Sequence, residues 1–354
     1  MMAVGQAREG GALAAGGLAG GAHGGPDALG VPAHDFSSNG NACGPCPPVR
    51  AALHRADAAH YPDPAYTALR ERLGAFHGVA PARIVPGASA SELIARLSAA
   101  VAQAAAASGR AARVWLPPQA YGDYARAAAA WGLARCEQAE AAQLAWCCDP
   151  SSPAGAPHAG LAELARLAGE PGGPAVVLDL AYEPLRLEGR LALDLAARDR
   201  LWQLWTPNKA LGLTGVRAAY AIAPVAAGDL TARLARLAPS WPLGSHGVAL
   251  LDAWCTPAAQ DWLAASRERL RRWKARQLAL CESLGWACRP SVANFFCARP
   301  PVDDLGPLLA ALRADGIKLR DTASFGLPGD VRVAVLPPAS QQALRRAWRQ
   351  RSAR

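Results

Sequence analysis

The sequence predicts an α/β fold, in which helices flank a mostly parallel sheet and a smaller α+β domain follows toward the C-terminus. Two observations carry this prediction. Short apolar runs alternate with helical patterns through the middle of the chain, which is typical of βαβ units. After Pro242 the pattern changes to one long helical region followed by shorter elements. The length of 354 residues fits one large domain with a smaller one appended.

Each element is predicted from its own pattern, in chain order. Apolar runs predict strands at residues 113–116, 144–148, 175–179, 201–205 and 218–222. Helical spacing predicts helices at 121–131 and 159–167, with a short turn near 191–198. Later come a helix at 262–284, an apolar run at 292–298, a helix at 302–315 and a strand at 331–335. We therefore expect a flexible N-terminal segment at 1–34, a large domain at 35–240 with an arm at 35–50, and a small domain at 241–354.

Composition excludes several classes of function. The formal net charge of +9 can indicate nucleic-acid binding. However, the arginines are scattered through amphipathic stretches such as 266–276, with no basic patch interleaved with aromatic residues, so we expect no nucleic-acid partner. No apolar run approaches the ~18 residues that span a bilayer, so we expect no membrane segment. The nine cysteines are odd in number and lack paired metal-ligand spacing, which favours a reduced, cytoplasmic protein without a metal site.

Cys43 and Cys46 have the spacing of a thioredoxin-type redox pair. That chemistry needs the first cysteine at a helix N-terminus directly after a buried strand, and here a turn-rich segment precedes it. A loop at the substrate entrance that carries two thiols is the competing interpretation.

Lys209 is the most informative single residue. The 37 lysines and arginines include only three lysines, and this one follows a strand-like apolar run. Arg217 comes eight residues later. A lysine on a loop at the carboxyl end of a strand, close to an arginine, suits a Schiff base beside a phosphate clamp, which is the chemistry of pyridoxal 5'-phosphate. A solvated surface lysine is the alternative.

A stretch of small residues at 86–91 opens an amphipathic helix. Small side chains let backbone N–H groups approach an anion at a helix N-terminus, so Ser89, Ala90 and Ser91 are candidates for phosphate binding. Ordinary helix capping by serine is the alternative. Tyr121, just after a predicted strand, would lie flat on a cofactor ring or else pack on the sheet.

Asp179 ends a buried apolar run, where an unpartnered carboxylate is costly. A carboxylate that keeps the pyridine nitrogen of the cofactor protonated would be such a partner. Tyr182 would hydrogen-bond the phenolic oxygen of the ring, and Thr206 and Asn208 would supplement the phosphate site. The order of these residues along the strand ends predicts a pyridoxal phosphate enzyme, with Lys209 as the proton shuttle.

Five stretches resemble a known family: 61–66 with Leu69 and Arg70, 209–217, 294–296, 316–321 and 331–333. The chain resembles the class I/II aminotransferases, which are fold-type I PLP-dependent transferases. It is most similar to the branch that holds histidinol-phosphate aminotransferase and the threonine-phosphate decarboxylase of cobalamin biosynthesis.

The resemblance implies further roles. Tyr61 would reach the cofactor phosphate of the neighbouring subunit, so a homodimer with shared active sites is implied. Arg332 would bind the α-carboxylate of a small-molecule substrate, an amino acid or a phosphorylated amine. Arg320 would lie near a substrate phosphate or another distal anion, and Asn39 would line the substrate pocket.

The sequence also departs from the family. The usual Asn-Pro-Asn-Asn-Pro-Thr-Gly stretch begins here at Asp149, and Ser152 falls where an asparagine normally contacts the ring oxygen. Leu180 replaces a glutamate, and Asn208 replaces a phosphate-binding serine. The essential charges survive, so we expect an active enzyme with altered substrate tuning; an inactive paralogue is the alternative.

The reaction itself is left open between two outcomes. Transamination between an amino compound and a 2-oxo acid, through a Lys209 Schiff base, is the first. Decarboxylation of L-threonine-O-3-phosphate is the second, because His23-Gly24-Gly25 resembles a signature of the cobalamin enzymes and makes His23 a candidate substrate ligand. A transcription regulator with an aminotransferase-like domain would need a helix-turn-helix module. The Gly/Ala-rich residues before the match do not supply one.

Overall fold

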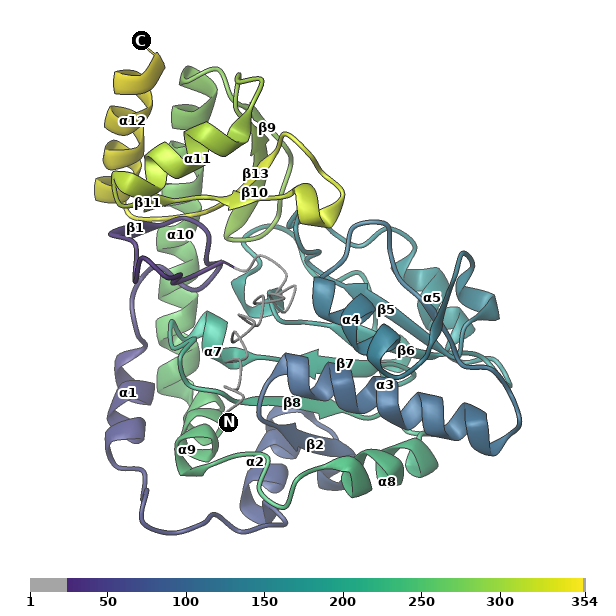
Figure 1. Cartoon of the computed structure of the whole chain (residues 1–354). Helices are drawn as coiled ribbons and strands as arrows, with labels where there is room; N and C mark the ends of the chain where they lie inside the picture. Colours follow the sequence, from purple (N-terminus) through teal and green to yellow (C-terminus); the bar gives the residue numbers. More distant parts are fainter. Residues whose placement is uncertain (1–23, 353–354) are drawn as a thin grey trace, which may run out of the picture.

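The computed structural model describes residues 24–352, in a large α/β domain with a smaller domain above it (Figure 1). A seven-stranded sheet forms the large domain, in the order β2-β8-β7-β6-β5-β3-β4. Its strands are β2 Ile84–Gly87, β3 Arg113–Trp115, β4 Ala134–Cys136, β5 Leu144–Cys148, β6 Ala175–Asp179, β7 Trp202–Trp205 and β8 Ala219–Ile222. The strands from β4 to β7 pair in parallel, and β8 runs antiparallel to both of its neighbours.

Helices cover both faces of this sheet. On one face lie α3 (Ala90–Ala107), α4 (Gly122–Ala130) and α8 (Gly228–Leu237), whose apolar side chains pack on Trp146 and Trp202. On the other lie α2 (Thr67–His77), α5 (Leu161–Leu167), α6 (Leu195–Arg198) and α9 (Ser245–Trp254). Both faces of the central strands are therefore buried, as a parallel sheet requires.

The smaller domain contains a four-stranded antiparallel sheet in the order β12-β13-β10-β9. Its elements are α10 (Pro257–Ser283), β9 (Ala287–Cys288), β10 (Phe295–Arg299), α11 (Leu305–Ala314), β11 (Ile317–Lys318), β12 (Arg320–Asp321), β13 (Val331–Ala334) and α12 (Pro338–Ser352). The N-terminal strand β1 (His34–Asp35) pairs in parallel with β11, and α1 (Pro47–His54) then leads into the large domain. Residues 34 and 35 are thus held against the C-terminal domain.

The predicted strands of the large domain agree with the observed ones to within one residue at each end. Two predictions were wrong in detail. Lys209 was expected on a loop, but it lies in the one-turn helix α7 (Pro207–Ala210), because Pro207 at its first position fits a helix start. Helix α10 begins at Pro257, five residues earlier than predicted, because Thr256 caps it and proline again occupies the first turn.

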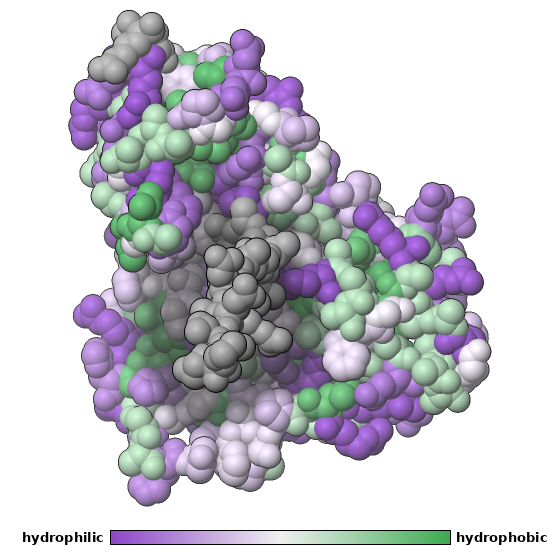
Figure 2. Space-filling model, viewed as in Figure 1, coloured by the Kyte–Doolittle hydropathy of each residue, from purple (hydrophilic) through white to green (hydrophobic). Residues whose placement is uncertain are grey.

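Hydrophilic and hydrophobic residues are interspersed over the face shown in Figure 2, as scattered arginines predict. Within the described residues, no helix is long and apolar enough to cross a membrane. The part of the predicted flexible segment that the structure describes, residues 24–34, contains Asp27, which forms ion pairs with Arg313 and Lys318 of the small domain.

Candidate active site

A cavity of about 290 Å³ lies at the carboxyl ends of β5, β6 and β7, between the two domains and the N-terminal segment. Open α/β sheets bind ligands at this edge. Fourteen of the residues singled out from the sequence line it: Asn39, Ser89, Ala90, Ser91, Tyr121, Ser152, Asp179, Tyr182, Thr206, Asn208, Lys209, Arg217, Arg320 and Arg332. Residues 293 positions apart in the chain therefore meet in one site (Asn39 and Arg332).

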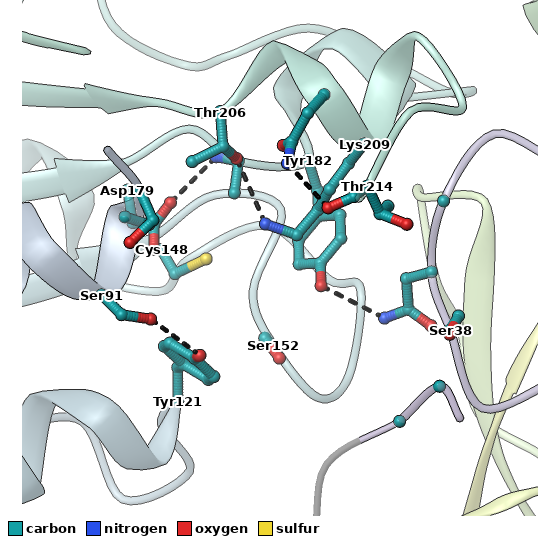
Figure 3. A pocket seen from close by; sticks show the side chains of 18 of the residues that line it. Ser38, Ser91, Tyr121, Cys148, Ser152, Asp179, Tyr182, Thr206, Lys209 and Thr214 are labelled. Carbon is teal, nitrogen blue, oxygen red and sulfur yellow. Dashed lines mark hydrogen bonds between the residues drawn. The ribbon is translucent and has the colours of Figure 1, made fainter. Parts of the chain in front are cut away.

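Lys209 projects into this cavity from α7, directly after β7 (Figure 3). Its Nζ donates a hydrogen bond to Thr206 Oγ1 at 3.2 Å and lies 5.4 Å from the centre of the Tyr182 ring. No carboxylate of the described residues forms an ion pair with it, so the amine is held in place by neutral groups. A partly buried lysine of this kind differs from the solvated surface lysine considered above.

Asp179 ends β6 and is 4% exposed. Its Oδ2 accepts a hydrogen bond from the hydroxyl of Tyr124 at 2.6 Å, and its Oδ1 accepts one from Ala181 N at 2.9 Å. Burial raises the pKa of Asp179, while Tyr124, Lys209 and Ala181 oppose the rise. Burial also raises the pKa of Tyr124, so this phenol remains a hydrogen-bond donor.

The small-residue segment forms the start of α3 as expected, with Ser89 as its cap. The Ser89 hydroxyl accepts a hydrogen bond from Glu92 N at 3.1 Å, so ordinary capping occupies it. Ser91 Oγ lies 3.4 Å from the hydroxyl of Tyr121, whose pKa burial raises. Tyr121 therefore stands over the same side of the cavity as the α3 N-terminus (Figure 3).

Two residues assigned to the phosphate site differ in how they are held. Arg217 is exposed and has no recorded hydrogen bond or ion pair with any described residue, so its guanidinium is available to a ligand. Asn208 is buried, and its Nδ2 donates to the backbone oxygens of Val216 at 3.1 Å and Thr214 at 3.5 Å. Its Oδ1 is buried without a partner. Asn208 therefore supports the loop that carries Arg217, while its amide nitrogen is already engaged.

Arg332 and Arg320 enter the cavity from the small domain. Arg332 Nη1 donates to Ser152 Oγ at 3.4 Å, and its Nη2 donates to Ser37 O at 3.1 Å. With its oxygen turned toward Arg332, the Asn39 amide accepts from Nε at 3.1 Å and from Nη1 at 3.3 Å. Arg320 donates to Ser324 Oγ at 2.8 Å, and burial, with Arg332 nearby, lowers its pKa.

One predicted residue, Tyr61, does not line the cavity. Tyr61 is 78% exposed and stacks on Trp241, with ring centres 4.3 Å apart. His23 lies outside the described residues, but Gly24 and Gly25, which follow it, line the cavity.

Sequence reasoning missed several lining residues, chiefly Tyr124, Phe325 and Cys148. Tyr124 offered one usable signal, because it lies one turn after Tyr121 on a helix that starts at a strand end. The position of Phe325 depends on how the two domains pack, which no local pattern reports.

The loop that carries the cysteine pair follows Gly40, which lines the cavity. Cys43 and Cys46 are free thiols, and neither lines the cavity. Burial raises the pKa of both, which opposes the reactive thiolate that redox chemistry needs. Across residues 24–352, no group of three or more metal-ligating side chains is found.

The sequence profile of aminotransferase class I and II matches residues 32–350. A histidinol-phosphate aminotransferase of Rhodospirillum rubrum is 32% identical over 329 residues, which is 85% of each chain. That of Ruegeria pomeroyi is 29% identical over 324 residues, covering 85% of this chain and 86% of the relative.

Solved structures share the fold. Histidinol-phosphate aminotransferase from Sinorhizobium meliloti, in complex with pyridoxal-5'-phosphate, has a TM-score of 0.73 at 22% identity and covers 89% of this chain and 90% of its own. L-threonine-O-3-phosphate decarboxylase from Porphyromonas gingivalis has a TM-score of 0.73 at 21% identity, covering 90% and 99%. This chain belongs to the class I and II aminotransferases, a family of enzymes that depend on pyridoxal phosphate.

Proposed function

We propose that the chain binds pyridoxal 5'-phosphate through Lys209 and transfers an amino group between a phosphorylated amine or amino acid and a 2-oxo acid. The observation that carries this proposal is the placement of Lys209 and the buried Asp179 in one cavity, at the ends of the adjacent parallel strands β7 and β6. Amine and carboxylate are the two groups that this cofactor needs from a protein.

The residues of the cavity fit the cofactor on three counts. Burial raises the pKa of Asp179 and so disfavours its ionised form. A cationic partner, such as a protonated pyridine nitrogen, would stabilise that form. Arg217 has a guanidinium without a partner among the described residues, and α3 directs its N-terminal N–H groups toward the same cavity. These donors suit a phosphate.

The roles of the side chains follow from their positions. Asp179, held by Tyr124, would keep a proton on the pyridine nitrogen, and Tyr121 would stack on the ring. When bound, pyridoxal phosphate withdraws electrons from the α-carbon of the substrate. Lys209, released from the cofactor by the incoming amine, would then move a proton to or from that carbon, with Thr206 fixing its amine.

The substrate class follows from the remaining charges. Arg332 and Arg320 would bind an anionic group of the substrate, and Asn39 and Ser152 would orient Arg332. The relatives act as histidinol-phosphate aminotransferases, so an amine that carries a phosphate is the first substrate to test. The predicted cytoplasmic location stays a prediction.

A homodimer is part of the proposal. Tyr61 is exposed, stacks on Trp241 and does not line the cavity of its own chain. If Tyr61 binds the cofactor phosphate of a second subunit, that role would explain why this large aromatic side chain is exposed beside Trp241.

Decarboxylation of L-threonine-O-3-phosphate is the second candidate. One observation favours it: Gly24 and Gly25, from the stretch that resembles the cobalamin enzymes, line the cavity. The names of the sequence relatives favour transamination.

In the deciding experiment, the purified protein is loaded with pyridoxal phosphate and then mixed separately with histidinol phosphate and with threonine phosphate. Histidinol phosphate should convert the cofactor to its amine form in a single turnover, and a 2-oxo acid should restore it. Threonine phosphate would instead release carbon dioxide repeatedly, without a change in the cofactor, if the second candidate holds. An unchanged cofactor spectrum with both substrates would contradict the proposed substrate class, and failure to take up the cofactor would contradict the function itself.

A further inference from the structure

Asp149 and Arg186 form a buried ion pair beside the active site but outside it. Their side chains are only 3% and 5% exposed, and Arg186 Nη2 donates to Asp149 Oδ1. Asp149 Oδ2 also accepts from His158 N at 3.3 Å. Arg186 Nε donates to Glu183 Oε2 at 2.7 Å. The function proposed above uses none of these side chains.

The pair joins two segments that supply the cavity. Asp149 is the first residue of the loop after β5. Three residues later, the same loop carries Ser152, which accepts a hydrogen bond from Arg332. Arg186 ends the short segment that follows Asp179, the last residue of β6, and that carries Tyr182. The guanidinium therefore bridges the loop that positions the substrate arginine to the segment that would hold the cofactor ring.

The loop has further attachments to both domains. Its outer end contacts the small domain, where Val292 N donates to Gly155 O at 2.8 Å and Cys297 Sγ donates to Pro153 O at 3.3 Å. Within the large domain, the backbone of Asp149 donates to Asp179 O at 3.1 Å, and Cys148 Sγ donates to Pro150 O at 3.2 Å. The buried ion pair is thus the charged link between the start of the loop and the sheet.

Asp149 also departs from the family stretch, which begins with asparagine. An aspartate there places a negative charge in a nearly closed space, which is costly without a cation. Arg186 supplies that cation. Its planar fork reaches Asp149 and Glu183 together, which a lysine would do less well.

We propose that Arg186 is a positioning residue for amino transfer: through Asp149 it holds the loop that carries Ser152, and thereby Arg332, against the segment that carries Asp179. This inference rests on the proposed function for its catalytic consequence, but the restraint on the loop stands on the ion pair alone.

The test compares Arg186→Met, Asp149→Asn and the double variant with wild type. Arg166→Met is the matched control, because the exposed Arg166 is paired with Glu163 and Glu170 and does not line the cavity. The first readout uses cofactor-free protein and measures how fast a neutral thiol reagent labels Cys148, which is 6% exposed and bonded to the loop. Cys136, on the edge strand, is the internal reference.

Each single variant should label at Cys148 about tenfold faster, with Cys136 unchanged, because the loop opens locally. In cofactor-loaded protein at saturating substrate, kcat should also fall about tenfold, because Arg332 loses its orientation. The double variant should be no worse than the poorer single one, because both changes remove the same link.

Independent, multiplying effects of the two substitutions would overturn the proposal. So would a lower melting temperature with unchanged Cys148 labelling, which is the signature of a merely structural pair. If Arg186→Met does not fold, Asp149→Asn, which changes no side-chain size, provides the same labelling result. If wild type binds no cofactor, the proposed function fails, and the labelling of cofactor-free protein still decides whether the pair restrains the loop.

Discussion

Replacing Tyr124 by phenylalanine should weaken cofactor binding in a pH-dependent way. The Tyr124 hydroxyl donates to Asp179 at 2.6 Å in a fully buried setting, and its ring stacks on Trp146 with centres 4.5 Å apart. Phenylalanine keeps the stacking and removes only the hydrogen bond. A hydrogen bond to a buried charged group contributes roughly 1.5–3 kcal/mol. Its loss therefore raises the pKa of Asp179, because the ionised carboxylate loses the donor that stabilises it.

The sign follows from which form of Asp179 binds the cofactor. The ionised carboxylate is needed, and burial already raises the pKa of Asp179, so affinity falls as the pH drops through that value. Tyr124→Phe should move the pH of half-maximal loss upward, so that affinity on the acidic side falls by about 10- to 100-fold relative to wild type. Dialysis equilibria of pyridoxal phosphate across a pH series measure this midpoint.

The matched control is Tyr220→Phe, which removes a buried hydroxyl bonded to His77 at 2.7 Å and does not line the cavity. It should leave the midpoint unchanged. Equal midpoints in Tyr124→Phe and wild type would refute the assignment of Asp179 as the partner of the cofactor ring.

Four further outcomes are expected. Lys209→Ala should lose the visible absorption of lysine-bound cofactor and nearly all turnover; normal colour and activity would exclude it as the attachment point. A mixture of Tyr61→Ala and Lys209→Ala subunits should recover about a quarter of wild-type activity, because half of the dimers are mixed and carry one intact site; no recovery would argue against shared sites. Arg320→Met should raise KM for a phosphorylated substrate by about 10- to 100-fold, while KM for an unphosphorylated amino acid changes little; equal effects would contradict a distal anion site. Burial lowers the pKa of His77 from 6.5 to about 4, so the unfolded chain binds more protons between these values and stability should fall, by up to about 3 kcal/mol, as the pH drops through that window. Urea unfolding of His77→Gln should lack this dependence.

Local patterns were sufficient for the strands and for the residues at their ends. The run that ends in Asp179 and the run before Lys209 are short, apolar and bounded by helical patterns, so their periodicity reports burial directly. Parallel strands bring their carboxyl ends to one edge, which is why both residues could be predicted to meet. Strand β2, with a proline inside it, and the exposed edge strand β4 lacked such a signal.

What could not be predicted depends on contacts between distant residues. Tyr124 and Asp179 are 55 positions apart, and their hydrogen bond requires that α4 packs against β5 and β6 in one orientation. The pairing of β1 with β11 likewise joins residues 34–35 to residues 317–318, which are far apart in the sequence. Asn208 was predicted to lie at the site, and it does. The sequence did not show that its amide donates to the backbone oxygen of Val216, a buried group that needs a partner.

The charges of the cavity argue for a substrate with more than one negative charge. Lys209, Arg217, Arg320 and Arg332 line it, and Asp179 is the single carboxylate among its described lining residues. The cofactor phosphate would neutralise Arg217, and Asp179 would be matched by the ring nitrogen. Arg332 and Arg320 then remain, and burial, together with the nearby charge of Arg332, lowers the pKa of Arg320. Holding two neighbouring guanidinium groups without a carboxylate between them costs electrostatic free energy. A bound phosphate, or a carboxylate and a phosphate together, would offset that cost. A small neutral side chain would leave that cost in place, so an amino acid such as alanine should be a poor substrate whichever bond the enzyme breaks.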